Sequence, residues 1–180
     1  MSQAAGPQLY ATEEQFLDGE AEAPEVRREV ITFLLGGESF GVELRALREI
    51  IKPPPLTEIP RAPRFLRGVL SLRGTMVPVL DLRRRLRLGA VAPEPQTRIL
   101  IVEYSGEPVG LLVDAVTDVA RIAERDIEAP PLGLGSSEAN HIVGIGRYQV
   151  ARQERVVVLL SVESVMRFEI DWSRPDRRGP

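Results

Sequence analysis

Short apolar runs separated by glycine and proline are the feature that most limits how this chain can fold. The 180 residues include fifteen glycines and fifteen prolines, and the longest uninterrupted apolar run, VVVLL at 156–160, has the length of one strand. A membrane-spanning helix needs about twenty consecutive apolar residues, so we expect no direct insertion into a membrane. Short runs rich in β-branched residues and bounded by turn formers are typical of strands. The spacing therefore predicts a mainly β protein.

Four pairs of these runs are joined by turn-forming residues and predict β-hairpins. The paired runs are 30–35 with 40–44, 68–72 with 76–82, 99–104 with 109–113, and 142–148 with 155–160.

Three local signals modify this picture. The apolar spacing becomes helical over 43–51, so the second strand is expected to pass into a turn of helix. Pro78 cannot donate to a ladder, so its strand is expected to lie at a sheet edge, to begin late or to bulge. Ser161 is a suitable N-cap for a last short helix over 162–168.

Many short strands with few brief helices favour small barrels or a sandwich over an alternating α/β sheet. Because each half opens with hairpins and holds a short helix, we expect two small barrels. One lobe is expected over roughly 29–88 together with a returning C-terminal segment, and the other over 97–160. Residues 1–28, with little apolar content, are expected to form a flexible acidic tail, and 169–180 a C-terminal tail.

The composition argues against most catalytic chemistry. Without cysteine, and with His141 as the one histidine, neither a zinc site nor a Cys–His pair is expected, and His141 is predicted at the surface or at a strand end. No glycine-rich phosphate-binding motif occurs, and no cofactor is expected. Asp114 and Asp118 would share a face if their segment were helical, which leaves a carboxylate hydrolase as one alternative. We expect a non-enzyme, and the absence of cysteine fits the reducing cytoplasm.

Charge is distributed unevenly. The net charge of −3 argues against a nucleic-acid partner, whose phosphates usually demand a basic excess. Eight arginines nevertheless lie between Arg61 and Arg87, so a nucleic-acid-binding small β-barrel that uses this cluster remains an alternative function. Arginine also suits carboxylate partners. Acidic residues crowd the first segment instead: Glu13, Glu14, Asp18, Glu20, Glu22 and Glu25.

Four segments in a fixed order carry a more specific signal. They are FGVELRALREII at 40–51, EIPRAPRFLRGVLSLRGTMVPVLDLR at 58–83, EPVGLLVDAVTDV at 107–119 and VVVLLSVESVM at 156–166. This series resembles the CheW family, the coupling proteins of bacterial chemotaxis, over about residues 29–168. The resemblance implies two SH3-like five-stranded β-barrels around a shared core, with a few short helices. It also implies a non-catalytic cytoplasmic adaptor, recruited to receptor complexes, that binds the regulatory domain of a histidine kinase and the cytoplasmic signalling tip of chemoreceptors.

The same resemblance implies a set of eight partner-binding residues, half of them in the segment 65–82. In family terms these are the ALREI-type stretch, the basic-Gly and LRG positions and a hairpin edge, which correspond here to Leu47, Glu49, Arg67, Gly68, Arg73, Gly74, Val109 and Gly110.

All of these residues except Arg67 also have a structural interpretation. Leu47 and Val109 could belong to the core, the three glycines could occupy turns or bulges, and Glu49 and Arg73 could form an internal ion pair. The longer acidic N-terminal segment, three consecutive prolines at 53–55 and the Arg83–Arg84–Arg85 run depart from the family pattern. They leave open whether the output is flagellar motility, pili or gene expression.

Overall fold

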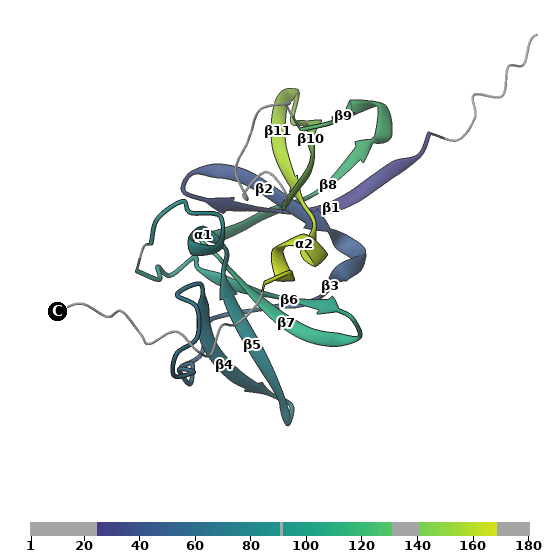
Figure 1. The fold of residues 1–180 in the computed structure, drawn as a ribbon. Helices are drawn as coiled ribbons and strands as arrows, with labels where there is room; N and C mark the ends of the chain where they lie inside the picture. The colour runs from purple at the N-terminus through teal and green to yellow at the C-terminus, as the bar shows by residue number, and fades with distance from the viewer. Residues whose placement is uncertain (1–24, 91, 131–140, 169–180) are drawn as a thin grey trace, which may run out of the picture.

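The structure is a computed structural model that describes residues 25–90, 92–130 and 141–168, and the regular elements of this part of the chain are mostly β-strands (Figure 1). The strands are β1 (Arg27–Leu35), β2 (Glu38–Glu43), β3 (Leu47–Ile51), β4 (Leu66–Leu72), β5 (Thr75–Asp81), β6 (Arg98–Tyr104), β7 (Glu107–Val113), β8 (Ala115–Ala123), β9 (Ile127–Glu128), β10 (Ile142–Val150) and β11 (Gln153–Leu160). The helical elements are single short turns: η1 (Leu44–Ala46), α1 (Leu82–Arg85), η2 (Glu124–Asp126) and α2 (Val162–Met166).

The strands form two sheets, with the orders β8-β1-β2-β11-β10-β9 and β3-β6-β7-β5-β4. The predicted mainly β fold with two lobes is confirmed, although one sheet has six strands because the two-residue β9 adds to its edge.

Each sheet takes strands from both of the expected lobes, the first of which was 29–88 with a returning C-terminal segment and the second 97–160. A parallel pairing of β2 with β11, through Phe40 opposite Val158, joins the first hairpin to the last one, so β3–β7 make up the other sheet. No local sequence signal specifies a pairing between segments so far apart along the chain.

The two sheets share one apolar core and each also has its own. Strand β6 shows this most clearly, because it is buried on both faces: Leu100 and Val102 belong to the shared cluster, whereas Ile99 and Ile101 pack inside the five-stranded sheet. Val165 of α2 adds to the shared cluster, and Figure 1 shows this helix between the strands of the two sheets. Burying one such side chain contributes about 1.5–3 kcal/mol, so the shared cluster holds the two sheets together.

All four predicted hairpins are confirmed, as β1–β2, β4–β5, β6–β7 and β10–β11. The turn of helix expected after the second strand is present as the 3-10 turn η1. The helical spacing does not continue to residue 51, because the β-branched end of this segment pairs as strand β3 with β6. Pro78 does not lie on an edge strand, since β5 has neighbours on both sides, but pairing with β7 begins only at Val79. The Ser161 cap is confirmed: its Oγ accepts from the backbone N–H of Ser164 at 3.1 Å.

Strand β1 begins at Arg27, so the last two residues of the predicted N-terminal tail are in fact strand. The rest of that tail up to residue 24, and the predicted C-terminal tail 169–180, lie outside the described residues. Within the described part of the chain, no helix has the length and apolar content needed to cross a bilayer.

Candidate functional site

An exposed ion pair joins the two edges of the five-stranded sheet. Glu49 lies on β3, at one edge, and Arg73 lies in the turn that follows β4, at the other edge. The guanidinium meets the carboxylate at two points, Nη1 to Oε1 at 3.0 Å and Nη2 to Oε2 at 3.1 Å. The Arg73 side chain is 78% exposed and that of Glu49 27%. The pair therefore brings β3 and β4 together while leaving part of the guanidinium available to a partner.

The turn that carries Arg73 depends on its two central residues. Arg73 has φ +49° and Gly74 has φ +85°, the left-handed values that a two-residue turn needs to match the twist of its strands. A Cβ on Gly74 would have nothing within 4 Å, so this glycine is required by the backbone conformation alone.

Two exposed apolar side chains lie near the ion pair along the chain, although Ile50, the strand neighbour of Glu49, points to the other face of β3. Ile50, next to Glu49, is 41% exposed, and Met76, at the start of β5, is 60% exposed. Leu47 is half-buried and packs against the shared core, which agrees with its alternative interpretation as a core residue. The sequence analysis missed Ile50 and Met76, although strand alternation could have indicated them. We call the group made up of Leu47, Glu49, Ile50, Arg73, Gly74 and Met76, gathered around the tip of the β4–β5 hairpin and the ion pair that joins it to β3, the hairpin-tip site.

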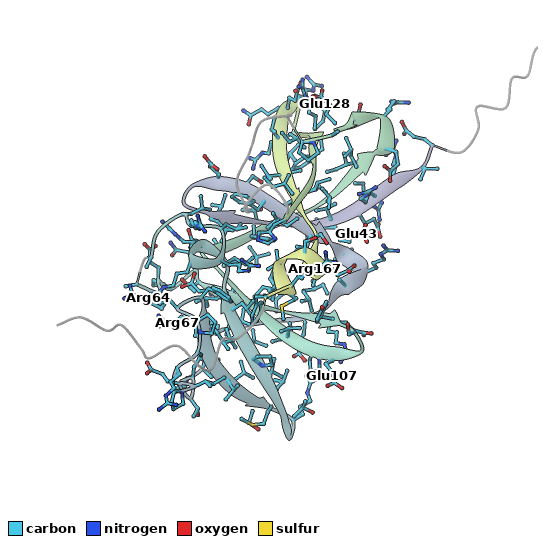
Figure 2. All side chains as sticks on the ribbon, in the orientation of Figure 1. Glu43, Arg64, Arg67, Glu107, Glu128 and Arg167 are labelled. Carbon is cyan, nitrogen blue, oxygen red and sulfur yellow. The ribbon has the colours of Figure 1, made fainter. Side chains whose placement is uncertain are left out.

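Arg67 and Gly68 lie elsewhere, where the proline-rich loop 52–65 folds back on β4. Gly68 has φ +141° at a bulge in β4, and a Cβ there would lie 2.4 Å from the carbonyl oxygen of Thr57. Thr57 in turn exchanges two 2.9 Å backbone hydrogen bonds with Val69 and so covers the sheet edge. Arg67 and Arg64 line a pocket under this loop, and Figure 2 shows both of them beside β4.

Val109 and Gly110 are internal rather than exposed. Val109 is 2% exposed and belongs to the shared core. Gly110 is buried in β7, where a Cβ would lie 2.8 Å from Ile99 Cγ2 and 3.1 Å from Val79 Cγ2. Both residues therefore serve packing, and for Gly110 the reason is close approach of side chains instead of the expected turn or bulge.

Most of the arginine cluster is engaged by the protein itself. Arg83 pairs with Asp114 at 2.9 Å and Arg84 with Asp81 at 3.2 Å. Arg85 donates to the carbonyls of Val165 and Arg167 near the end of α2. Its guanidinium also lies over the rings of Phe65 and Phe168, 5.0 and 6.0 Å from their centroids. Burial lowers the pKa of Arg85. Because these arginines contact other parts of the protein, they do not form the continuous basic surface that nucleic-acid binding would need.

Asp114 and Asp118, the two carboxylates considered for hydrolysis, have separate structural roles. Asp114 directly precedes strand β8, and Asp118 lies on it. Asp114 accepts from the backbone of Gly36 at 2.7 Å as well as from Arg83, whereas Asp118 accepts from the backbone of Val119 at 2.7 Å. His141 stands at a strand end as predicted, but it is buried rather than on the surface. Among the described residues, no group of three His, Asp or Glu side chains could hold a metal ion.

Comparison with known proteins gives one consistent answer. Residues 29–169 match the model of the CheW-like domain family. The chain is 35% identical to the chemotaxis protein CheW of Rhizobium meliloti over 77% of its own length and 86% of that protein. It is 32% identical to the chemotaxis protein CheW of Helicobacter pylori, over 76% and 80% of the two chains.

A solved structure supports the same assignment. The scaffolding protein TtCheW from Thermoanaerobacter tengcongensis superposes with a TM-score of 0.72 at 29% identity, covering 81% of this chain and 97% of that one. The shared two-sheet fold, the matching family model and the curated relatives therefore show that this chain belongs to the CheW-like domain family.

Proposed function

We propose that this chain is a cytoplasmic adaptor that couples the signalling tip of chemoreceptors to the regulatory domain of a histidine kinase. Its family makes it a non-catalytic protein of chemotaxis signalling. An adaptor of this kind acts by assembly: it holds two partners at once, and no bond is made or broken in the adaptor itself.

The hairpin-tip site is the surface that we propose for the receptor. A receptor tip is a helical hairpin, and a helix docks through a few apolar anchors with charged residues at the rim. Ile50 and Met76 offer exposed apolar area, and Arg73 retains donors beyond those that its Glu49 pair uses. The observation that carries this proposal is the exposed two-point ion pair between Arg73 and Glu49, which presents an oriented guanidinium at the tip of the β4–β5 hairpin.

The kinase domain must use a face that the receptor leaves free. The test is capture of the chain by an immobilised receptor tip, by an immobilised kinase regulatory domain, and by both together. We expect the chain to bind each partner separately and to carry the kinase domain onto receptor-coated beads. Failure to bind either partner, or displacement of one partner by the other, would contradict the proposal.

A matched pair of variants assigns the receptor surface. Arg73→Glu is expected to weaken receptor capture about tenfold or more, the usual effect of losing one charge-assisted interfacial contact. Arg121→Glu is the control, because Arg121 is also exposed and also pairs with a carboxylate, that of Glu29, but lies on the six-stranded sheet. Equal losses for the two variants would argue for a non-specific charge effect.

A further inference from the structure

The pocket beneath the loop 52–65 has an excess of positive charge that its own carboxylates do not match. It has a volume of about 290 Å³ and is lined by Glu58, Ile59, Ala62, Pro63, Arg64, Leu66, Arg67 and Arg84. Three guanidinium groups therefore face one carboxylate. Arg84 is already held by Asp81 and by the carbonyl oxygen of Arg64, at 3.2 Å in each case. Arg64 and Arg67 make no ion pair within the described part of the chain, and we call this cavity the basic pocket.

A second pocket, on the six-stranded side of the molecule, is also rich in arginine, but the arginines that line it are matched by neighbouring carboxylates. Arg27 and Arg125 both pair with Glu25, Arg121 pairs with Glu29, and Arg147 pairs with Glu128. A carboxylate ligand would compete with these pairs there, whereas in the basic pocket it would meet guanidinium groups without a carboxylate partner.

The basic pocket is also held in shape before any ligand arrives. Its loop wall is fixed by hydrogen bonds from Ala62 to the Ile59 carbonyl at 3.3 Å and from Leu66 to the Pro63 carbonyl at 2.8 Å. Proline restricts φ in the same wall, and Gly68 permits the close approach of Thr57 behind it. Aliphatic side chains between the arginines would suit a peptide that alternates acidic and small apolar residues.

The chain itself contains such a peptide. Residues 1–24 hold five acidic side chains and neither lysine nor arginine, and ATEEQFLDGEAEAP at 11–24 places small apolar residues between the acids. This segment leads into β1, whose start lies on the opposite side of the molecule from β4 and the labelled Arg64 and Arg67 (Figures 1 and 2).

The reach of the acidic segment indicates whether it can bind the basic pocket of its own domain or that of a second copy of the chain. Glu22, Glu20 and Asp18 precede Arg27 by five, seven and nine residues, so even fully extended chain carries them only about 17–31 Å. A compact domain of about 140 residues has a radius of gyration near 14 Å and is roughly 37 Å across. These three acids fall short of that span, whereas Glu13 and Glu14, at about 43–50 Å of extended chain from Arg27, do not. The whole segment therefore fits the pocket of a neighbouring copy more readily than the pocket of its own domain.

We propose that the basic pocket binds the acidic segment 11–24 of a second copy of this chain. Donor and acceptor surfaces differ in such a contact, so copies join head to tail and the assembly can extend. This self-association is independent of the adaptor function proposed above, and either proposal can fail without the other.

The direct test is fluorescence anisotropy with a labelled peptide of residues 11–24. The full-length acceptor carries Glu13→Gln, Glu14→Gln, Asp18→Asn, Glu20→Gln and Glu22→Gln, so that its own segment does not compete. We expect saturable binding that weakens roughly tenfold when Arg64→Gln and Arg67→Gln are added together, since two charge-assisted contacts are lost. Arg121→Gln is the matched control and should leave the affinity unchanged. Binding that is insensitive to the pocket changes would overturn the proposal.

Complementation by sedimentation velocity tests the arrangement between copies. The chain with the neutralised segment and the chain with Arg64→Gln and Arg67→Gln should each be monomeric, yet their mixture should form a dimer, because each supplies what the other lacks. The dimer should dissociate in about 1 M salt, where the Debye length is near 3 Å. A monomeric mixture, or self-association of either variant alone, would overturn the proposal, as would an oligonucleotide that occupies the pocket more tightly than the peptide.

Discussion

The two sheets share a core but differ in how they use surface charge. On the six-stranded sheet, exposed arginines pair with carboxylates on neighbouring elements, as in Arg28 with Glu124 and Arg121 with Glu29. The five-stranded sheet also has exposed pairs, Arg48 with Glu103 between β3 and β6 and Arg73 with Glu49 across the two sheet edges. Its Arg64 and Arg67, however, face a pocket without an ion pair among the described residues. The difference lies in the pockets: the arginines of the pocket on the six-stranded side are paired with carboxylates, whereas Arg64 and Arg67 are not, so we expect recognition to use the five-stranded sheet.

The largest expected effect concerns the core that both sheets share. Leu111→Ala removes a fully buried side chain of the shared cluster and should lower the free energy of unfolding by about 3 kcal/mol. Because the cluster joins both sheets, urea should still unfold them in one transition. Hydrogen exchange of backbone amides in β7 and in β11 measures the unfolding of each sheet. Separate unfolding transitions for the two sheets would contradict the shared core, because two sheets that share one core should unfold as one cooperative unit.

Gly68→Ala should have the next largest effect. Its new Cβ would collide with the Thr57 carbonyl at a positive φ, and we expect a loss of about 2 kcal/mol in the free energy of unfolding. Gly74→Ala is the control, because its φ is also positive but no atom lies near the new Cβ. It should lose about 1 kcal/mol. Equal losses in chemical denaturation would mean that the contact between loop and strand contributes nothing.

Glu49→Gln should change stability only slightly. The pair with Arg73 is exposed on the arginine side, so its removal should lower the free energy of unfolding by less than about 1 kcal/mol. Receptor binding should fall by more than this, since the guanidinium loses the carboxylate that orients it. A stability loss as large as the binding loss, measured by thermal melting and by titration, would identify the pair as structural.

The smallest effect is a pH dependence on the six-stranded side. The hydrogen bond from Arg27, followed by the charge of Arg125, lowers the pKa of Glu25 below its ordinary value of 4.5. Its stabilisation is therefore present above pH 4.5 and is lost as pH falls through the lowered pKa. Glu25→Gln should make the loss of stability in acid slightly shallower, whereas Glu107→Gln, on the five-stranded sheet, should not. An identical acid profile for wild type and Glu25→Gln would contradict this assignment.

Local patterns were sufficient to predict the hairpins and the Ser161 cap, because turn chemistry and caps depend on neighbouring residues. The order of strands was not predictable, since the β2–β11 pairing joins distant segments and divides the chain differently from the expected lobes. The helical spacing of 43–51 was misleading because pairing with β6 overrides local preference.

Family motifs predicted the site residues only in part. The Glu49–Arg73 pair had been considered as an alternative, and the structure contains it. Val109 and Gly110 match the family pattern equally well but are buried, because a motif records which residues occur together and not which of them reach the surface. The basic pocket was not foreseen, since Arg84 joins Arg64 and Arg67 only through the folded loop.

The central claim is that the hairpin-tip site binds the receptor through Arg73, and receptor-dependent kinase activation with three variants tests it most directly. Arg73→Glu should abolish activation. The double variant Glu49→Arg, Arg73→Glu restores an ion pair with the two charges exchanged, and it places a carboxylate where the guanidinium was. If Arg73 contacts the receptor, the double variant should fold normally and remain inactive, whereas Arg121→Glu should activate normally. Full recovery of activation in the double variant would contradict the account, because it would show that the pair only holds β3 and β4 together.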